Sequence, residues 1–167
     1  NLYWLGRYTE RAENTIALAR LTLECLNGED QTCPSLLEWL DRMARFNFLV
    51  LPDVPPLSLS RRVFERALIA NLGSDTMASS VGFNLRAVRQ AGAAVRERLS
   101  FEHWHRIECA QDELAGAFAR LDSPAEYGSL DALDLLKTVG QHMAATTGAQ
   151  TDRMTRDDGG RTLSIGR

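Results

Sequence analysis

The fold is decided by the opening segment, NLYWLGRYTERAENTIALARLTLECLNG, which is residues 1–28. Its apolar and small residues recur at alternating spacings of four and three, the pattern of a long amphipathic helix with one buried side. Asn27 followed by Gly28 predicts where this helix ends. The residues that form the expected buried seam are Leu5, Thr9, Ala12, Ile16, Ala19, Leu23 and Leu26.

Five more helical patterns follow the first, and no convincing strand pattern occurs. Ser60 and Asp75 are the expected N-caps of the third and fourth helices. In the last helix, one face is expected to carry Leu130, Leu133, Leu136, Val139 and Met143. Short connections favour antiparallel neighbours, so we expect an all-α antiparallel helical bundle of about six helices. The later helices are expected at about 34–51, 60–72, 75–99, 100–121 and 130–143.

Composition excludes several classes of protein. Hydrophobic residues make up 44% and charged residues 25% of the 167 residues, as in an ordinary globular domain. No apolar run is long enough to span a bilayer. The net charge is -3 and the basic residues are scattered, so nucleic acid is not an expected partner. Cys25, Cys33 and Cys109 are odd in number and lack metal-ligand spacing, which favours a reducing compartment, the cytoplasm.

The first helix carries a second, polar side. Tyr3, Arg7, Glu10 and Asn14 lie opposite the apolar seam. Two interpretations remain open. These polar residues could form an ion-pair lattice that is enclosed between helices, or they could bind a ligand. The sequence R-x-x-E-R-A occurs here, at residues 7–12, and again at 62–67.

Other polar groups lack the spacing of a catalytic or metal site. His103 and His105 are two residues apart, so on a helix they point away from each other. The adjacent Asp157 and Asp158 fit a helix N-terminus, and a magnesium site is the less favoured alternative. No glycine-rich phosphate loop, nucleophile elbow or zinc-protease motif occurs. We therefore expect no metal and no cofactor.

Three stretches resemble the bacterial alpha-E domain family. Residues 1–14 resemble the opening helix of the family, whose members carry R-Y-x-E-R-A-E-N after aromatic residues. Residues 80–104 and 154–167 resemble later family stretches in the same order, so the resemblance covers the whole chain. Gly160 and Thr162 depart from the tryptophan and phenylalanine that the family commonly has there. Family members are longer, so residues 1–167 are expected to be the N-terminal part of one alpha-E-like helical domain.

The resemblance implies a function. Family members are typically encoded beside, or fused to, circularly permuted ATP-grasp proteins and transglutaminase-like peptidases. It implies a non-catalytic accessory or interaction module of a peptide- or amide-ligase system, with an ATP-grasp protein as partner and no turnover by this chain alone. The alternatives are an enzyme domain with a buried Arg/Glu/Asp cluster and a purely structural bundle. The candidate polar cluster matches the family's polar positions: Arg7, Glu10, Arg11, Glu13, Asn14, Arg156 and Asp157.

Overall fold

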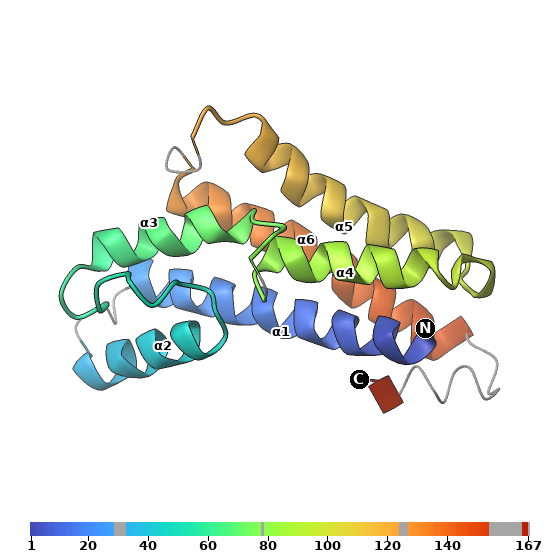
Figure 1. Cartoon of the computed structure of the whole chain (residues 1–167), viewed down its shortest axis with the longest axis horizontal. Coiled ribbons are helices and arrows are strands. Elements are labelled where there is room, and N and C mark those ends of the chain that lie inside the picture. The colour runs from blue at the N-terminus through green and yellow to red at the C-terminus, as the bar shows by residue number, and fades with distance from the viewer. Residues whose placement is uncertain (29–32, 78, 124–126, 154–164, 167) are drawn as a thin grey trace.

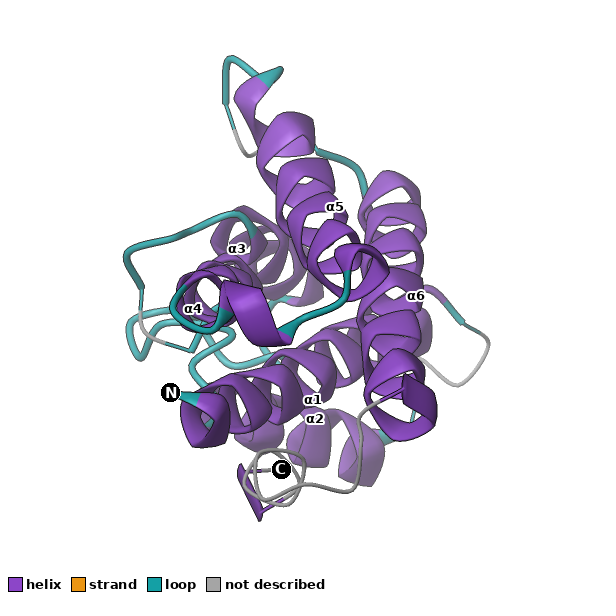
Figure 2. Ribbon diagram, turned by 90° about the vertical axis from the view of Figure 1, so that its right-hand side faces the viewer, coloured by secondary structure: helices purple, strands orange, loops and turns teal. Residues whose placement is uncertain are grey.

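The computed structural model describes residues 1–28, 33–77, 79–123, 127–153 and 165–166, and the side chains of 149–153 are outside this description. The described residues form α-helices and no strand, which confirms the all-α prediction (Figure 2). A short 3-10 turn, η1 (Arg96–Arg98), precedes α5. The α-helices are α1 (Leu2–Asn27), α2 (Pro34–Phe46), α3 (Arg61–Leu72), α4 (Val81–Ala93), α5 (Phe101–Ala119) and α6 (Ser129–Arg153).

Four of these helices form a closed bundle. The α1 helix packs against α4 and α6, and α5 packs against the same two helices. The shorter α2 and α3 helices lie over the C-terminal half of α1, at the left of Figure 1. The long first helix is therefore shared by the bundle and by the α2–α3 layer.

The predicted seam of α1 is confirmed, because all seven of its residues are buried. Burying a leucine or isoleucine side chain contributes roughly 1.5–3 kcal/mol, so this seam drives the assembly of the bundle. Buried hydroxyls on α1 are satisfied within the helix. Thr9 donates to the Leu5 carbonyl at 2.7 Å, and Thr22 donates to the Leu18 carbonyl at 2.8 Å. The polar members of the buried side therefore leave no unpaired hydroxyl.

Serine caps set the beginnings of three helices. Ser60 caps α3 as predicted, and Ser80 and Ser100 cap α4 and α5. The prediction that Asp75 caps the fourth helix is wrong. The hydroxyl of Ser80 accepts from the Phe83 amide and also donates to the Ser74 carbonyl, so it both starts α4 and closes the turn before it. Asp75 instead forms an ion pair with Arg86 at 3.0 Å.

The ends of two helices and one core residue also differ from prediction. The second helix ends at Phe46, five residues early, because the chain turns at Phe48, where φ is 56°. The fourth ends at Ala93 and η1 takes over part of the expected length. Leu130 is 73% exposed because it stands in the first turn of α6, beyond the bundle. The rest of the predicted α6 face packs in or against the core.

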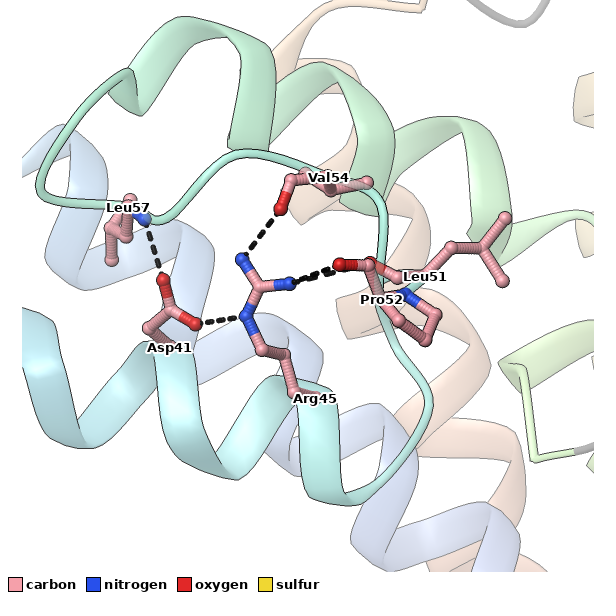
Figure 3. A network of polar contacts seen from close by, with 6 residues as sticks. All are labelled: Asp41, Arg45, Leu51, Pro52, Val54 and Leu57. Carbon is pink, nitrogen blue, oxygen red and sulfur yellow. Dashed lines mark hydrogen bonds and ion pairs between the residues drawn. The ribbon is translucent and has the colours of Figure 1, made fainter.

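A network of polar contacts fastens the α2–α3 connection to α2 (Figure 3). The Arg45 guanidinium donates to the Asp41 carboxylate and to the carbonyls of Leu51, Pro52 and Val54, the last at 2.8 Å. The second Asp41 oxygen accepts from the Leu57 amide. Both charged side chains are largely buried, so the loop carbonyls are satisfied mainly by one arginine.

Arg45→Ala is expected to lower the free energy of unfolding by about 2–3 kcal/mol, because the Asp41 carboxylate and several loop carbonyls lose the arginine that donates to them. Urea unfolding monitored by circular dichroism measures the change. The matched control is Arg42→Ala on the same helix, which removes an exposed pair with Glu38 and should cost at most about 0.5 kcal/mol. Equal losses in the two variants would show that the network does not hold the loop.

Gly82→Ala is expected to lower the free energy of unfolding by about 1–3 kcal/mol. A Cβ atom on Gly82 would lie 2.7 Å from the Ser74 carbonyl oxygen, and that oxygen is backbone that cannot rotate away. Thermal unfolding of Gly82→Ala and of Gly148→Ala provides the comparison. A Cβ on Gly148 meets nothing within 4 Å, so this helical site should gain stability from alanine. A stabilised Gly82→Ala would contradict the close packing of the turn against α4.

Candidate functional site

The polar side of α1 faces solvent. Arg7 and Glu10 form an ion pair at 3.1 Å, with 51% and 33% of their side chains exposed. Asn14 is exposed on the same side. An ion pair of this kind contributes at most about 1 kcal/mol. The interpretation that these residues are enclosed between helices is therefore wrong for the described part of the chain.

The other candidate residues of α1 point in different directions. Arg11 donates to the Ser79 hydroxyl at 3.0 Å, on the connection that precedes α4. Glu13 accepts from the Thr147 hydroxyl on α6. The described members of the candidate cluster are thus split among solvent, the α4 side and the α6 side. Arg156 and Asp157 lie outside the described residues.

A buried polar junction joins α1 to α4. Asn84 is fully buried, and its side-chain amide donates to the Thr15 hydroxyl at 3.2 Å and to the Ser79 carbonyl at 3.3 Å. Ser79 has a φ of 74°, and it is held through its hydroxyl by Arg11 and through its carbonyl by Asn84. The junction fixes the start of α4 relative to α1. The sequence signal for it was Asn84 itself, a polar residue among the buried positions Val81, Leu85 and Val88.

An open groove of about 480 Å³ lies between the N-terminal half of α1 and α4. We call it the α1–α4 groove. Trp4 and Tyr8 stack with their ring centroids 5.9 Å apart and line it from α1. The remaining lining residues belong to α4 or to the turn before it: Asp75, Phe83, Arg86, Ala87, Gln90 and Ala91.

The α1–α4 groove was not predicted as a site from the sequence. Asp75 was predicted only as a helix cap, and Trp4 was not predicted to be a site residue. The combination of Trp4 and Tyr8 at a spacing of four, which puts both rings on one side of α1, was the available signal. Nothing in the sequence shows that Arg86 lies opposite them.

Histidine and cysteine side chains gather on α5. His105 is exposed and lies 3.5 Å from the Cys109 sulfur, one helical turn on. His103 is buried, so the prediction that the two histidines point apart is confirmed. Among the described residues, no three His, Cys, Asp or Glu side chains are placed to hold one metal ion.

A family model described as a predicted alpha-helical domain with a conserved ER motif, Alpha-E, matches residues 1–167. The chain belongs to the Alpha-E family. No curated protein and no solved structure matches the chain. In the described part of this Alpha-E domain, no helix has the length and apolar character needed to cross a membrane.

The Glu-Arg dipeptide of the family description occurs at 10–11, 65–66 and 97–98, and the first two copies lie within R-x-x-E-R-A. In the first copy, the glutamate pairs with Arg7 on the solvent side and the arginine reaches Ser79. In the second copy, partial burial raises the pKa of Glu65, and Arg66 is exposed. In these two R-x-x-E-R-A copies, adjacent Glu and Arg residues of this Alpha-E domain occupy different environments.

The stability of the domain is expected to fall as the pH falls from about 6.5 to about 4. Burial lowers the pKa of His103 from 6.5 to about 4, so the unfolded chain takes up a proton in this range before the folded one does. The free energy of unfolding should therefore drop by up to about 3 kcal/mol across this range and be fully regained above it. Urea unfolding at a series of pH values measures this slope.

His103→Gln should remove the contribution of His103 to the pH dependence of the free energy of unfolding. His105→Gln, at an exposed position, should keep that contribution. The pKa of His142 is also lowered, by burial and then by Arg106, so the comparison of variants isolates the contribution of His103. An unchanged slope in His103→Gln would show that His103 does not resist protonation in the folded state.

Proposed function

We propose that this Alpha-E domain is a non-catalytic interaction module of a bacterial peptide- or amide-ligase system, and that it docks a circularly permuted ATP-grasp protein. The class of partner comes from the family resemblance. The observation that carries the docking role is the conformation of Phe48, an exposed aromatic residue with positive φ. Such residues are costly, and strain of this kind concentrates at functional sites.

Phe48 closes the C-terminus of α2. The Phe48 amide donates to the Arg45 carbonyl at 3.1 Å, and the Leu49 amide donates to the Ala44 carbonyl at 2.9 Å. In this closing pattern, the residue with positive φ is usually glycine or asparagine, because a side chain there costs about 1 kcal/mol or more. Phe48 bears that cost while 54% of it remains exposed. The folded chain alone gains little from a phenylalanine at this position.

Two more aromatic residues are exposed on α2. Phe46 is 79% exposed, and Trp39 lies two turns earlier on the same side of the helix and is nearly half exposed. The opposite side of α2 is buried, through Leu37, Leu40 and Ala44. We call Trp39, Phe46 and Phe48 the α2 aromatic face. Rigid aromatic side chains are the usual anchors of protein–protein interfaces, so this face supports a docking role.

The two alternative functions, an enzyme domain and a purely structural bundle, receive less support. A catalytic Arg/Glu/Asp cluster needs its members to converge, and Arg7, Arg11 and Glu13 contact different parts of the molecule. A purely structural bundle gives no reason for an exposed phenylalanine at a position that suits glycine.

Phe48→Gly is the decisive variant. It should raise the free energy of unfolding by about 0.5–1 kcal/mol, because glycine adopts positive φ without strain, and it should also weaken docking. Affinity capture of a co-encoded circularly permuted ATP-grasp protein, followed by a titration of the two purified proteins, measures docking. A variant that is more stable but binds less cannot owe its loss of binding to unfolding.

Phe101→Ala is the control, because Phe101 is also an exposed phenylalanine but lies at the start of α5, outside the α2 aromatic face. It should dock as the wild type does. Capture of no ATP-grasp protein by the wild type would overturn the proposed function. Equal docking by the wild type and Phe48→Gly would overturn the role of the α2 aromatic face.

A further inference from the structure

The α1–α4 groove combines an aromatic wall with hydrogen-bond donors on a facing helix, and nothing in the proposed function uses it. We propose that it binds the C-terminal end of a short peptide whose last residue is aromatic or large and apolar. Arg86 holds the terminal carboxylate, and the Trp4–Tyr8 wall takes the last side chain. This inference goes beyond docking, because the groove shares no residue with the α2 aromatic face.

The rings of the aromatic wall contact one another along α1, and the wall is open to solvent. Trp4 stacks on Tyr8 at 5.9 Å and meets the edge of Tyr3 at 5.4 Å, so its ring is held by neighbours along α1. Even so, Trp4 is 53% exposed. A ring that is already ordered loses little conformational freedom on binding, so its apolar face is available for a ligand at low entropic cost.

On the α4 side, the groove is lined by small side chains along two turns of the helix. Ala87 and Ala91 are the small residues there, and Phe83 lies one turn before them. From Phe83 to Ala91 the helix rises about 12 Å. An extended chain covers about 3.3 Å per residue, so this length accommodates three or four residues. The size of the groove therefore suits the end of a peptide better than a large folded surface.

The polar groups on α4 can donate hydrogen bonds to an anion. Arg86 and Gln90 are one helical turn apart and both line the groove, so the helix fixes their position relative to the aromatic wall. Arg86 pairs with Asp75 at 3.0 Å, but this pair is exposed and therefore weak. A ligand carboxylate can replace Asp75 on the planar guanidinium by two parallel hydrogen bonds.

The replacement of Asp75 by a ligand carboxylate on Arg86 suits a peptide better than an isolated anion. The Gln90 amide can donate to the carboxylate or to the preceding carbonyl. Asp75, released from Arg86, becomes an acceptor beside the carboxylate and can receive a peptide N–H. A carboxylate, an adjacent N–H and an apolar side chain occur together at the C-terminus of a peptide, so all three parts of the groove are matched by one ligand.

The probe is N-acetyl-glycyl-phenylalanine, titrated into the intact domain by calorimetry and compared with its C-terminal amide. The free acid should bind about tenfold more tightly than the amide, the usual value of one charge-assisted contact. N-acetyl-glycyl-alanine, which keeps the carboxylate and lacks the ring, should bind about tenfold more weakly than the phenylalanine peptide. Neither measurement includes a partner protein, so failure here and failure of the docking function are distinguishable.

Two variants assign the contacts. Arg86→Gln should abolish the difference between acid and amide, and Trp4→Leu should abolish the difference between phenylalanine and alanine peptides. The matched controls are Arg89→Gln, on the same helix but paired with Asp112 on α5, and Phe101→Leu, an exposed aromatic residue at the start of α5 that does not line the groove. Both controls should bind as the wild type does, and circular dichroism checks the folding of all four.

Equal affinities for the acid and the amide in the wild type would overturn the carboxylate site, since an apolar groove alone does not distinguish them. An acid preference that survives Arg86→Gln in the folded variant would also overturn it. The absence of binding at millimolar peptide would overturn the proposal as a whole.

Discussion

The α1 helix packs against α2, α3, α4 and α6, and its position between them is the constraint on which the rest of the molecule depends. Its seam, with Leu5 and Leu23 fully removed from solvent, fixes α4 and α6 around one axis. The packed sides of α1 therefore have different neighbours, and the side with Arg7 and Glu10 faces solvent. Adjacent residues of this helix consequently reach different parts of the structure, and this separates Arg11, which meets the start of α4, from Glu13, which meets α6.

This arrangement explains how far the sequence could predict the structure. A period of 3.6 residues identifies the buried side of α1, because burial of that side is what the pattern records. The period also groups Arg7 with Glu10, and the two do pair. The period carries no information about which helix, if any, covers a polar side. The interpretation that the polar side of α1 is enclosed between helices therefore could not be tested before the structure. The predicted helix boundaries were wrong where a local sequence rule competed with packing. Ser80, and not Asp75, caps α4, because the Ser80 hydroxyl also reaches the Ser74 carbonyl.

The two non-glycine residues with positive φ in the described chain differ in what surrounds them. Ser79 is held through its hydroxyl by Arg11 and through its carbonyl by the buried Asn84, so its strain is offset by contacts that join α1 to α4. At Phe48, Asn71 donates to the Phe48 and Leu49 carbonyls at 3.0 and 3.1 Å. These contacts hold the backbone, but they do not involve the phenyl ring. The conformation at Ser79 is thus explained by the fold, whereas the choice of phenylalanine at Phe48 is not.

The two proposed surfaces lie at different places along α1. The α1–α4 groove includes Trp4 and Tyr8 near the N-terminus of α1, and α2 lies over its C-terminal half (Figure 1). Because one continuous helix passes beneath both, their separation is set by the rise of α1 and not by a flexible connection. A partner on the α2 aromatic face and a peptide in the groove would therefore contact different residues of this chain. The rigid α1 helix would then hold the peptide end at a fixed distance from the docked protein, which is the geometry that an accessory module needs in order to present a substrate.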